Sequence, residues 1–211
     1  MSQREESEDS PPENLLIVGL GNPGKEYEQT RHNAGFLAVD EFSRRLRADS
    51  SWKEKFQGVF TTQNASGGKI ILLKPMTYMN ESGVSVQQAA KFFKIPPTDV
   101  CIVHDDMDHP LGTVRLKRGG GDGGHNGLKS VSKHLSKRNY LRLRFGIGRP
   151  NIPQEADISR DFVHSWVLGK FSEEERSRLR EALERASSAL EALLHDGFEK
   201  AQNVVNKRNA K

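Results

Sequence analysis

The sequence predicts a single α/β domain in which helices flank a mixed, mostly parallel, twisted sheet. Short apolar runs alternate with stretches of helical periodicity along most of the 211 residues, and one hairpin interrupts this alternation. The run at residues 15–18 is apolar at every position, which is typical of a strand buried on both faces of a parallel sheet. No internal repeat divides the chain and no linker separates two apolar cores, so we expect one domain.

The first half of the chain predicts a strand and helix, then a hairpin, then a second helix. Apolar residues recur at helical spacing after the first strand, and turn residues at 64–68 separate the two strands of the hairpin. Pro75 ends the hairpin because proline cannot donate to a central ladder, and Pro96 ends the following helix. The elements expected here are a strand at 15–18, a helix at 36–46, strands at 58–63 and 69–74, and a helix at 81–93.

The second half of the chain predicts three strands, a glycine-rich loop and two helices. Leucine and phenylalanine alternate with Arg142 and Arg144, which predicts a strand with one charged face. The last helix follows Ser172, and Glu175 stands three residues later as in a capping box. The elements expected here are strands at 100–103, 113–116 and 140–147, a helix at 128–135, an apolar segment at 162–168, and a helix after residue 172.

The composition is that of a soluble globular protein. No apolar run approaches the ~20 residues of a membrane span, and the start of the chain is too acidic for a signal or transit peptide. The single cysteine, Cys101, excludes an internal disulfide and fits a reducing compartment, so we expect a cytoplasmic protein. Nothing in the sequence asks for more than a monomer. We interpret residues 1–13 as a disordered acidic tail, 14–205 as the domain and 206–211 as a polar C-terminal tail.

Basic residues are concentrated in one region of a chain whose formal net charge is +4. Between positions 115 and 149 stand Arg115, Lys117, Arg118, Lys129, Lys133, Lys137, Arg138, Arg142, Arg144 and Arg149. Such a concentration favours a polyanionic partner, with nucleic acid as the leading candidate. A merely basic surface is the alternative, because charge patterns alone discriminate poorly.

The loop at residues 19–35, which reads GLGNPGKEYEQTRHNAG, holds the richest set of reactive side chains. It follows the first strand, and open α/β sheets bind their ligands at the carboxyl ends of strands. Its imidazole, His32, stands between a cation and an amide, and Asn22 and Tyr27 precede it. This combination favours a reaction site over a structural loop, with His32 as the catalytic candidate.

The same loop matches the glycine pattern G-x-G-x-x-G of dinucleotide-binding folds at residues 19–24. Three features argue against that interpretation. Pro23 removes a backbone N–H from the turn that would hold the pyrophosphate, and no helix opens at Gly24. The nearest acidic residue in the following helix, Asp40, lies closer than the expected ~20 residues. A nicotinamide-dependent oxidoreductase is therefore only the third hypothesis.

Two further clusters accompany this loop. The glycine-rich stretch at 118–130 departs from a phosphate-binding P-loop because Leu128 separates glycine from lysine, but it would let a nucleic-acid backbone approach Asn126 closely. The acidic stretch at 104–108 follows a buried strand and lacks the ligand spacing of a zinc site. Its oxygens leave a magnesium site open, but no other feature supports one, so we expect no metal there. We expect one carboxylate, Asp105, to orient His32 and stabilise its charged form.

Together these segments resemble the bacterial-type peptidyl-tRNA hydrolase family. The resemblance extends from about Leu15 to the C-terminal helix. Six motifs carry it in order, namely GLGNPG at 19–24, TRHNAG at 30–35, TYMNESG at 77–83, HDDMD at 104–108, GGHNGLKS at 123–130 and RLRFGIGRP at 142–150.

The resemblance implies a single α/β domain that cleaves the ester between a peptide and the 3′ end of tRNA without a cofactor. It implies that His32 is the general base, that Asp105 is its carboxylate partner, and that Asn22 helps to distinguish a blocked amine from a free one. The residues implied to hold the terminal nucleotide and peptide backbone are Tyr27, Tyr78, Asn80 and Asn126, and those implied to clamp a tRNA phosphate are Lys117 and Arg144.

The residues themselves agree with this chemistry but leave roles open. Either Asn80 or Asn126 can orient the water or donate to the oxyanion, and the sequence does not decide between them. Asp122, His109 and the N-terminal extension depart from the family pattern. An RNA-binding module without catalysis, carried by the basic strand and the glycine loop, is the alternative hypothesis.

Overall fold

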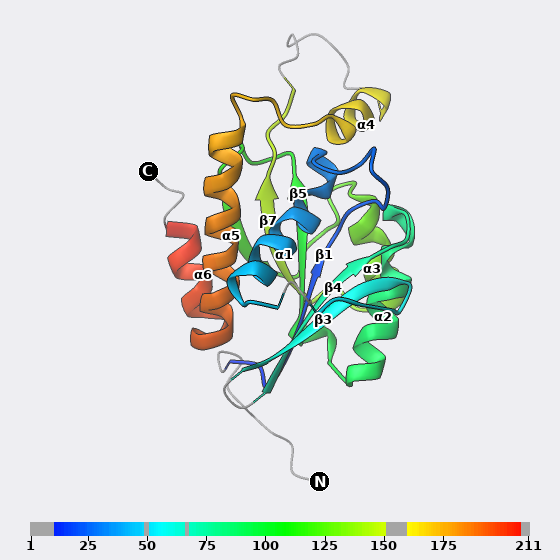
Figure 1. Cartoon of the computed structure of the whole chain (residues 1–211), viewed down its shortest axis with the longest axis vertical. Coiled ribbons are helices and arrows are strands. Elements are labelled where there is room, and N and C mark those ends of the chain that lie inside the picture. Colours follow the sequence, from blue (N-terminus) through cyan, green and yellow to red (C-terminus); the bar gives the residue numbers. More distant parts are fainter. Residues whose placement is uncertain (1–10, 49–50, 66–67, 151–159, 208–211) are drawn as a thin grey trace.

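The computed structural model describes residues 11–48, 51–65, 68–150 and 160–207. In this part of the chain the strands form one twisted sheet of seven, in the order β2-β3-β4-β1-β5-β7-β6 (Figure 1). The strands are β1 (Asn14–Gly19), β2 (Lys53–Lys55), β3 (Gly58–Ala65), β4 (Gly68–Pro75), β5 (Val100–Asp106), β6 (Val114–Arg118) and β7 (Leu141–Gly146).

The sheet is mixed, with a parallel centre. Strands β4, β1, β5 and β7 are mutually parallel, while β3 pairs antiparallel with β4, and β6 pairs antiparallel with β7. Because β2 is antiparallel to β3, it shares the direction of the centre, so β3 and β6 alone among the described strands run the other way. The predicted α/β domain with a mixed, mostly parallel sheet is confirmed.

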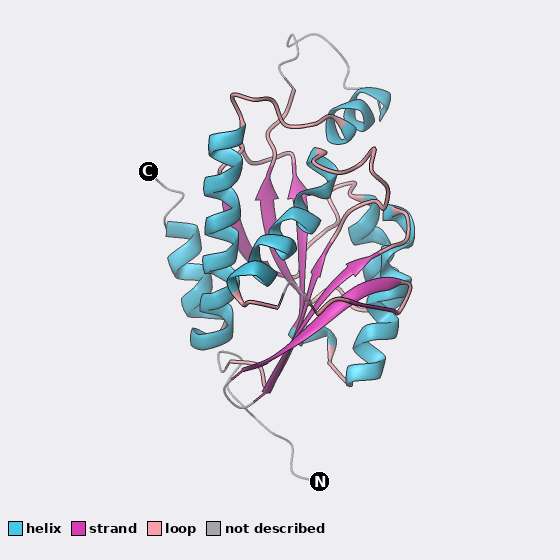
Figure 2. Ribbon diagram, viewed as in Figure 1, coloured by secondary structure: helices cyan, strands magenta, loops and turns pink. Residues whose placement is uncertain are grey.

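Helices cover both faces of the sheet (Figure 2). Helices α1, α5 and α6 pack together on one face, while α2 and α3 pack together on the other. Helix α4 lies beyond the carboxyl ends of the central strands. The bounds are α1 (Ala34–Arg45), α2 (Ser82–Phe93), α3 (Asn126–Leu135), α4 (Arg160–Leu168), α5 (Arg176–Asp196) and α6 (Phe198–Lys207), with 3-10 turns η1 (Arg31–Asn33), η2 (Met79–Glu81) and η3 (Pro97–Asp99).

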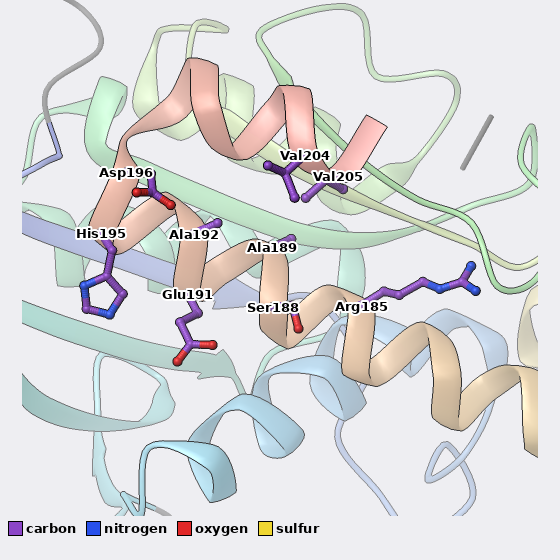
Figure 3. A pocket seen from close by; sticks show the side chains of 9 residues that line it. All are labelled: Arg185, Ser188, Ala189, Glu191, Ala192, His195, Asp196, Val204 and Val205. Atoms are coloured by element: carbon purple, nitrogen blue, oxygen red, sulfur yellow. The ribbon is translucent and has the colours of Figure 1, made fainter. Parts of the chain in front are cut away.

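The C-terminal part folds differently from the prediction. Gly197, with φ of 80°, ends α5, and α6 then turns back along it, so the predicted boundary between domain and tail at residue 206 falls inside a helix. The amide of Asn206 pairs with both backbone groups of Leu116, at 3.2 and 3.3 Å, and so covers the edge strand β6. Residues of α5 and α6 line a hollow of about 340 Å³ (Figure 3), and none of the predicted site residues lies in its lining.

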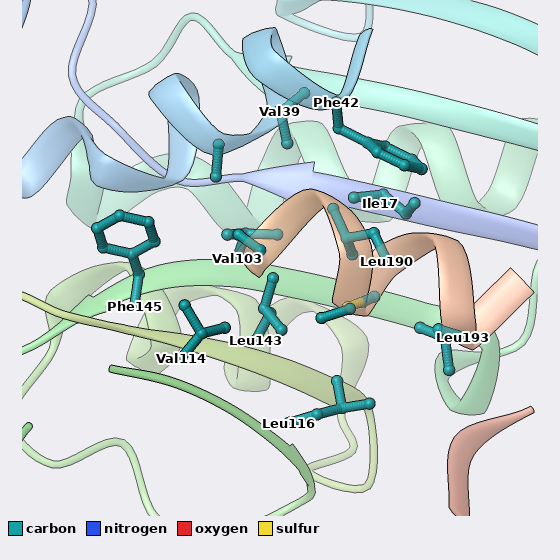
Figure 4. Close-up of a cluster of buried hydrophobic side chains, with 14 of the residues drawn as sticks. Ile17, Val39, Phe42, Val103, Val114, Leu116, Leu143, Phe145, Leu190 and Leu193 are labelled. Carbon is teal, nitrogen blue, oxygen red and sulfur yellow. The ribbon is translucent and has the colours of Figure 1, made fainter. Parts of the chain in front are cut away.

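Strand β1 explains why the central runs are apolar at every position. Leu15 and Ile17 point to the core under α1 and α5, and Leu16 and Val18 point to the core under α2 and α3. Figure 4 shows the first core, where Phe42 of α1 and Leu190 of α5 meet the sheet. Burial on both faces fixes the ends of these strands, and with them the loops that follow.

The described helices give no sign of a membrane span, because none of them combines the necessary length with an apolar composition. The predicted acidic tail lies mostly outside the described residues. Its last member, Glu13, accepts a hydrogen bond of 3.1 Å from the backbone N–H of Lys69, beside the start of β1.

Candidate active site

A cleft of about 930 Å³ opens at the carboxyl ends of the central strands. Its lining comes from the end of β5, the glycine-rich loop, the start of α3 and helix α4. Open α/β sheets place their ligand sites at this edge. Of the residues predicted for the site, the cleft lining includes His32, Asp105, Lys117, Asn126 and Arg144.

Close backbone packing holds the loop of His32 against the strand ends. A β-carbon added to Gly35 would lie 2.4 Å from both Leu20 N and Val103 O, so only glycine lets α1 start this close to the sheet. The N–H of Leu20 donates to the carbonyl of Val103 at 2.9 Å, which ties the chain after β1 to β5. His32 therefore stands on a rigid turn, η1, between two strand ends.

His32 and Asp105 are in direct contact. Nδ1 of His32 lies 2.9 Å from Oδ1 of Asp105, and both side chains are largely buried. Burial lowers the pKa of His32, but the charge of Asp105 and this hydrogen bond outweigh burial and raise the pKa above its ordinary value. Burial would raise the pKa of Asp105, yet the neighbouring imidazoles hold it below its ordinary value. These two shifts keep Asp105 anionic and make the imidazole of His32 more basic than usual.

His125 is a second imidazole on the same carboxylate, and it was not among the predicted residues. Its Nε2 lies 2.9 Å from Oδ1 of Asp105. Its Nδ1 accepts the backbone N–H groups of Gly127 and Leu128, at 3.1 and 3.4 Å, and so caps helix α3. Since a backbone N–H can only donate, the proton of His125 is on Nε2 and points at Asp105.

The tautomer of His32 follows from the same arrangement. The anionic Asp105 can only accept hydrogen bonds, so the Nδ1 of His32 is the donor nitrogen and its Nε2 carries the lone pair. Among the described residues Nε2 has no hydrogen-bond partner. This geometry presents a proton acceptor to the cleft, which is what a general base requires.

These three side chains could also be considered as a metal site, because one ligand atom from each lies within 4.8 Å of the others. The capping role of His125 argues against that use. A cation on Nε2 would require the ring to carry its proton on Nδ1, where two N–H groups already point. The donor set therefore fits a hydrogen-bonded relay better than a metal centre.

Asn22 is held beside this group by backbone contacts. Its Oδ1 accepts the N–H of Met79 at 2.8 Å, and its own backbone exchanges two hydrogen bonds with the Asn33 side chain, at 2.9 and 3.0 Å. The amide Nδ2 makes no hydrogen bond to a described residue. Asn22 thus offers a donor that is held directly against Asn33 of η1.

Met79 brings the other predicted amides together. It is buried, and a β-carbon on Gly127 would lie 2.6 Å from its sulfur, so η2 packs directly on the start of α3. Asn80 follows Met79 and Asn126 precedes Gly127, and both are exposed. Tyr78 is 62 % exposed and Tyr27 is partly buried. Unlike Asn126, Asn80 and the two tyrosines lie outside the cleft lining.

The predicted charged face of β7 is not a solvent-exposed face. Arg142 is 3 % exposed, and its guanidinium donates to the carbonyls of Gly120 and Gly121. Gly120 and Gly121 are themselves exposed, and the buried guanidinium offers a charged donor to each of their carbonyls. Arg142 thus holds the glycine loop, which the alternation of the strand could not indicate.

The two predicted phosphate-binding cations differ in their environment. Lys117 is exposed, and a β-carbon on Gly120 would meet its Nζ at 3.3 Å, which places the ammonium over the glycine loop. Arg144 donates from Nε to Oδ2 of Asp106 at 2.5 Å and is partly buried. A ligand phosphate would find Lys117 unpaired among the described residues, but would compete with Asp106 for Arg144.

Comparison with known proteins identifies the family. The sequence profile of peptidyl-tRNA hydrolase matches residues 16–211. The chain belongs to the peptidyl-tRNA hydrolase family. The resemblance inferred from the six motifs is thereby confirmed, together with the hydrolase class.

Individual peptidyl-tRNA hydrolases match over nearly their whole length. The proteins of Nostoc punctiforme and Sorangium cellulosum are 49% and 47% identical to this chain over 194 residues, which is 92% of the chain and 90% and 84% of those proteins. The crystal structure of peptidyl-tRNA hydrolase from Acinetobacter baumannii superposes with a TM-score of 0.83 at 42% identity, and covers 92% of this chain and 95% of that one.

Within this hydrolase fold, sequence reasoning passed over His125 and Arg142. A signal for His125 was present, because the residue stands immediately before a helix start and follows glycines that allow unusual backbone angles. Its second contact, to Asp105, depends on tertiary structure. The catalytic and binding roles of the nine predicted residues remain predictions.

Proposed function

We propose that this chain hydrolyses the ester bond between a peptide, or another N-blocked aminoacyl group, and the 3′ end of tRNA, releasing free tRNA for translation. Membership of the peptidyl-tRNA hydrolase family supports the reaction class. The observation that carries the mechanism is the contact of 2.9 Å between His32 and a buried Asp105, at a cleft with cations in its wall. We propose that the protein works as a cytoplasmic monomer without a cofactor.

The proposed reaction begins with a water molecule beside Nε2 of His32. His32 takes one proton from the water as its oxygen attacks the ester carbonyl, and Asp105 stabilises the imidazolium that forms. The tetrahedral intermediate collapses when the bond to the ribose oxygen breaks, and the imidazolium returns the proton to that oxygen. The products are a tRNA with a free terminal hydroxyl and a peptide carboxylic acid, which releases its proton to solvent and becomes a carboxylate.

Amide groups around Met79 would stabilise the charge that develops on the carbonyl oxygen. Asn126 lines the cleft, Asn80 lies on the neighbouring turn, and the fixed Nδ2 of Asn22 is a donor beside them. We propose that Asn22 also contacts the blocked amine of the substrate, and so separates it from a charged free amine. Either Asn80 or Asn126 then orients the water.

The nucleic-acid part of the substrate would contact aromatic and basic side chains. Tyr27 and Tyr78 are accessible and could stack on the terminal base or ribose, as proteins commonly hold single-stranded RNA ends. Lys117 and Arg144 would hold a phosphate of the tRNA further along the cleft.

The decisive test compares N-blocked aminoacyl-tRNA with its free-amine form. The wild-type protein should release tRNA from the blocked substrate alone, with or without EDTA, and His32→Ala should lower the rate by about 10²–10⁴. His195→Ala, on α5 outside the cleft, is the matched control and should keep the wild-type rate. Salt-dependent RNA binding by a folded protein that turns nothing over would instead support the RNA-binding alternative. Loss of activity in EDTA would contradict the absence of a metal.

A further inference from the structure

We propose that Arg31 is a positioning residue that ties the loop of His32 to the segment after α4. It thereby fixes the position of His32 relative to helix α4, which forms one wall of the cleft. The inference rests on the proposed function of His32. Arg31 begins the turn η1 directly before His32, and α4 packs against that turn. The segment after α4 is far away in sequence, at residues 169–175.

The guanidinium and the backbone N–H of Arg31 donate to that segment. Nη1 donates to the carbonyl of Lys170 at 2.7 Å, and Nη2 pairs with Oε2 of Glu175 at 2.8 Å. The backbone N–H of Arg31 donates to the carbonyl of Gly169 at 3.0 Å. With Arg31 only 6% exposed, these charge-assisted contacts lie where solvent screens them least.

Aromatic rings complete the enclosure of the guanidinium. Its central carbon lies 3.9 Å from the ring centroid of Trp166 and 5.3 Å from that of Phe171. The indole Nε1 of Trp166 donates in turn to the carbonyl of Gly148 at 3.0 Å, beyond β7. Arginine is suited to this site because its planar guanidinium can stack on an aromatic ring and donate two hydrogen bonds at the same time, which the ammonium of lysine cannot do.

Helix α4 makes this anchor relevant to catalysis. Val163, His164 and Val167 of α4 line the same cleft as His32. Trp166 comes from the same helix, so a shift of α4 moves the ring that stacks on Arg31. Reactions of this kind lose rate steeply when a reacting group is displaced by about an ångström. The position of the base and the position of the cleft wall are therefore mechanically linked through Arg31.

Removing the guanidinium should not unfold the adjacent helix. Oε2 of Glu175 also accepts the backbone N–H of Ser172 at 2.7 Å, and the N–H of Glu175 donates to Oγ of Ser172 at 3.3 Å. This capping box at the start of α5 does not need Arg31. An effect on rate can therefore be separated from loss of the fold.

The experiment uses the full chain carrying Trp52→Phe, so that Trp166 is the remaining tryptophan of two. Arg31→Met and Arg31→Lys are compared in this background. Arg31→Met should lower kcat about 10- to 100-fold with KM changed by less than about threefold, and should shift the Trp166 emission. Arg31→Lys should recover part of kcat and part of the wild-type Trp166 emission. Arg45→Met is the matched control, because Arg45 also pairs with a glutamate, Glu191 of α5, and its side-chain hydrogen bonds to described residues go to α5 and not to the cleft lining. It should change neither kcat nor the Trp166 emission.

Two results would overturn the inference. One is an unchanged kcat in Arg31→Met although the Trp166 emission has shifted, and the other is a lost kcat with the emission unchanged. Titration of the His32 ring by NMR gives a readout that does not depend on turnover, and it should differ between wild type and Arg31→Met. If the wild-type protein itself does not cleave peptidyl-tRNA, the proposed function fails, while the emission and the His32 titration still decide whether Arg31 is the anchor.

Discussion

His125 donates from Nε2 to Oδ1 of Asp105 across 2.9 Å, while its other ring nitrogen caps helix α3. One side chain therefore fixes both a buried carboxylate and the start of a helix. The glycines before it make this possible, since Gly123 and Gly124 have φ of 57° and 84°, which few other residues adopt. The glycine-rich loop thus places His125 against Asp105, the partner of His32, and also leaves space for a ligand.

Substitution of His125 should separate these two roles. His125→Ala loses the cap, about 1 kcal/mol, and a hydrogen bond to a charged group, about 1.5–3 kcal/mol, so its unfolding free energy should fall by the sum. His125→Asn restores an effective cap but not the contact with Asp105. We expect Asn to recover about 1 kcal/mol in urea unfolding while kcat stays about tenfold or more below wild type. A fully active Asn variant would show that Asp105 does not need this donor.

The pH dependence of kcat/KM should report the raised pKa of His32. The base works only when neutral, so activity should fall as pH drops through that pKa, with a midpoint above the ordinary 6.5. Asp105→Asn removes the charge that raises the pKa and leaves at most a hydrogen bond to a neutral oxygen, while burial, the largest cause, still lowers the pKa. The midpoint should then move below 6.5, and the plateau rate should fall by roughly 10²–10⁴. The measurement is a pH–rate profile of both proteins.

Folding stability gives an independent check on the same pair. A group whose pKa is raised by folding stabilises the native state below its unfolded pKa, and this contribution is lost as pH rises through the folded value. The stabilising contribution of His32 should therefore be present at acidic pH and lost above the midpoint of the rate profile. In Asp105→Asn that contribution should vanish. An acid limb at the same pH in both proteins would assign the titration to another group.

The elements of the fold that were predictable are those with a clear pattern within their own segment. The helix expected at 81–93 is observed as Ser82–Phe93, because helical periodicity and two following prolines define it within the segment itself. Strand β2 was missed, because Lys53, Glu54 and Lys55 are all exposed and show no apolar alternation. The break at Gly197 was also missed, since the apolar stripe of α5 gives no hint of a second helix packing back on it.

The part of the candidate site that lies at or after the ends of parallel strands was predictable from the sequence. His32 stands on η1 in the loop that follows β1, Asp105 stands within the end of β5, and the topology of parallel strands brings such positions together. Arg142 could not be assigned from sequence, because its burial depends on carbonyl groups of a loop that precedes it by about twenty residues. The pairing of Arg144 with Asp106 likewise arises only from the register of β5 and β7.

Lys117 should contribute to binding of full tRNA but not to the chemistry. Lys117→Ala should raise KM for N-blocked aminoacyl-tRNA and reduce the slope of log K against log salt by about 0.7–0.9, the loss of one phosphate contact. Turnover of a minimal ester of the 3′ nucleotide should not change. Lys200→Ala on α6, exposed and outside the cleft, is the control. Equal losses on the full and minimal substrates would refute a phosphate contact at Lys117.

Asp106 should weaken the binding of Arg144 to a phosphate of the substrate. The two side chains are paired and only partly accessible, and a phosphate must compete with this carboxylate for the guanidinium. Asp106→Asn removes the charge but keeps an oxygen to accept the N–H of Asp108, which now lies 2.9 Å from Asp106. If releasing the pair is worth about 0.5–1 kcal/mol, KM for full tRNA should fall about two- to fivefold, and the minimal ester should be unaffected. A rise in KM for full tRNA would instead mean that Asp106 holds Arg144 in its binding position, so the direction of the change decides between competition and support.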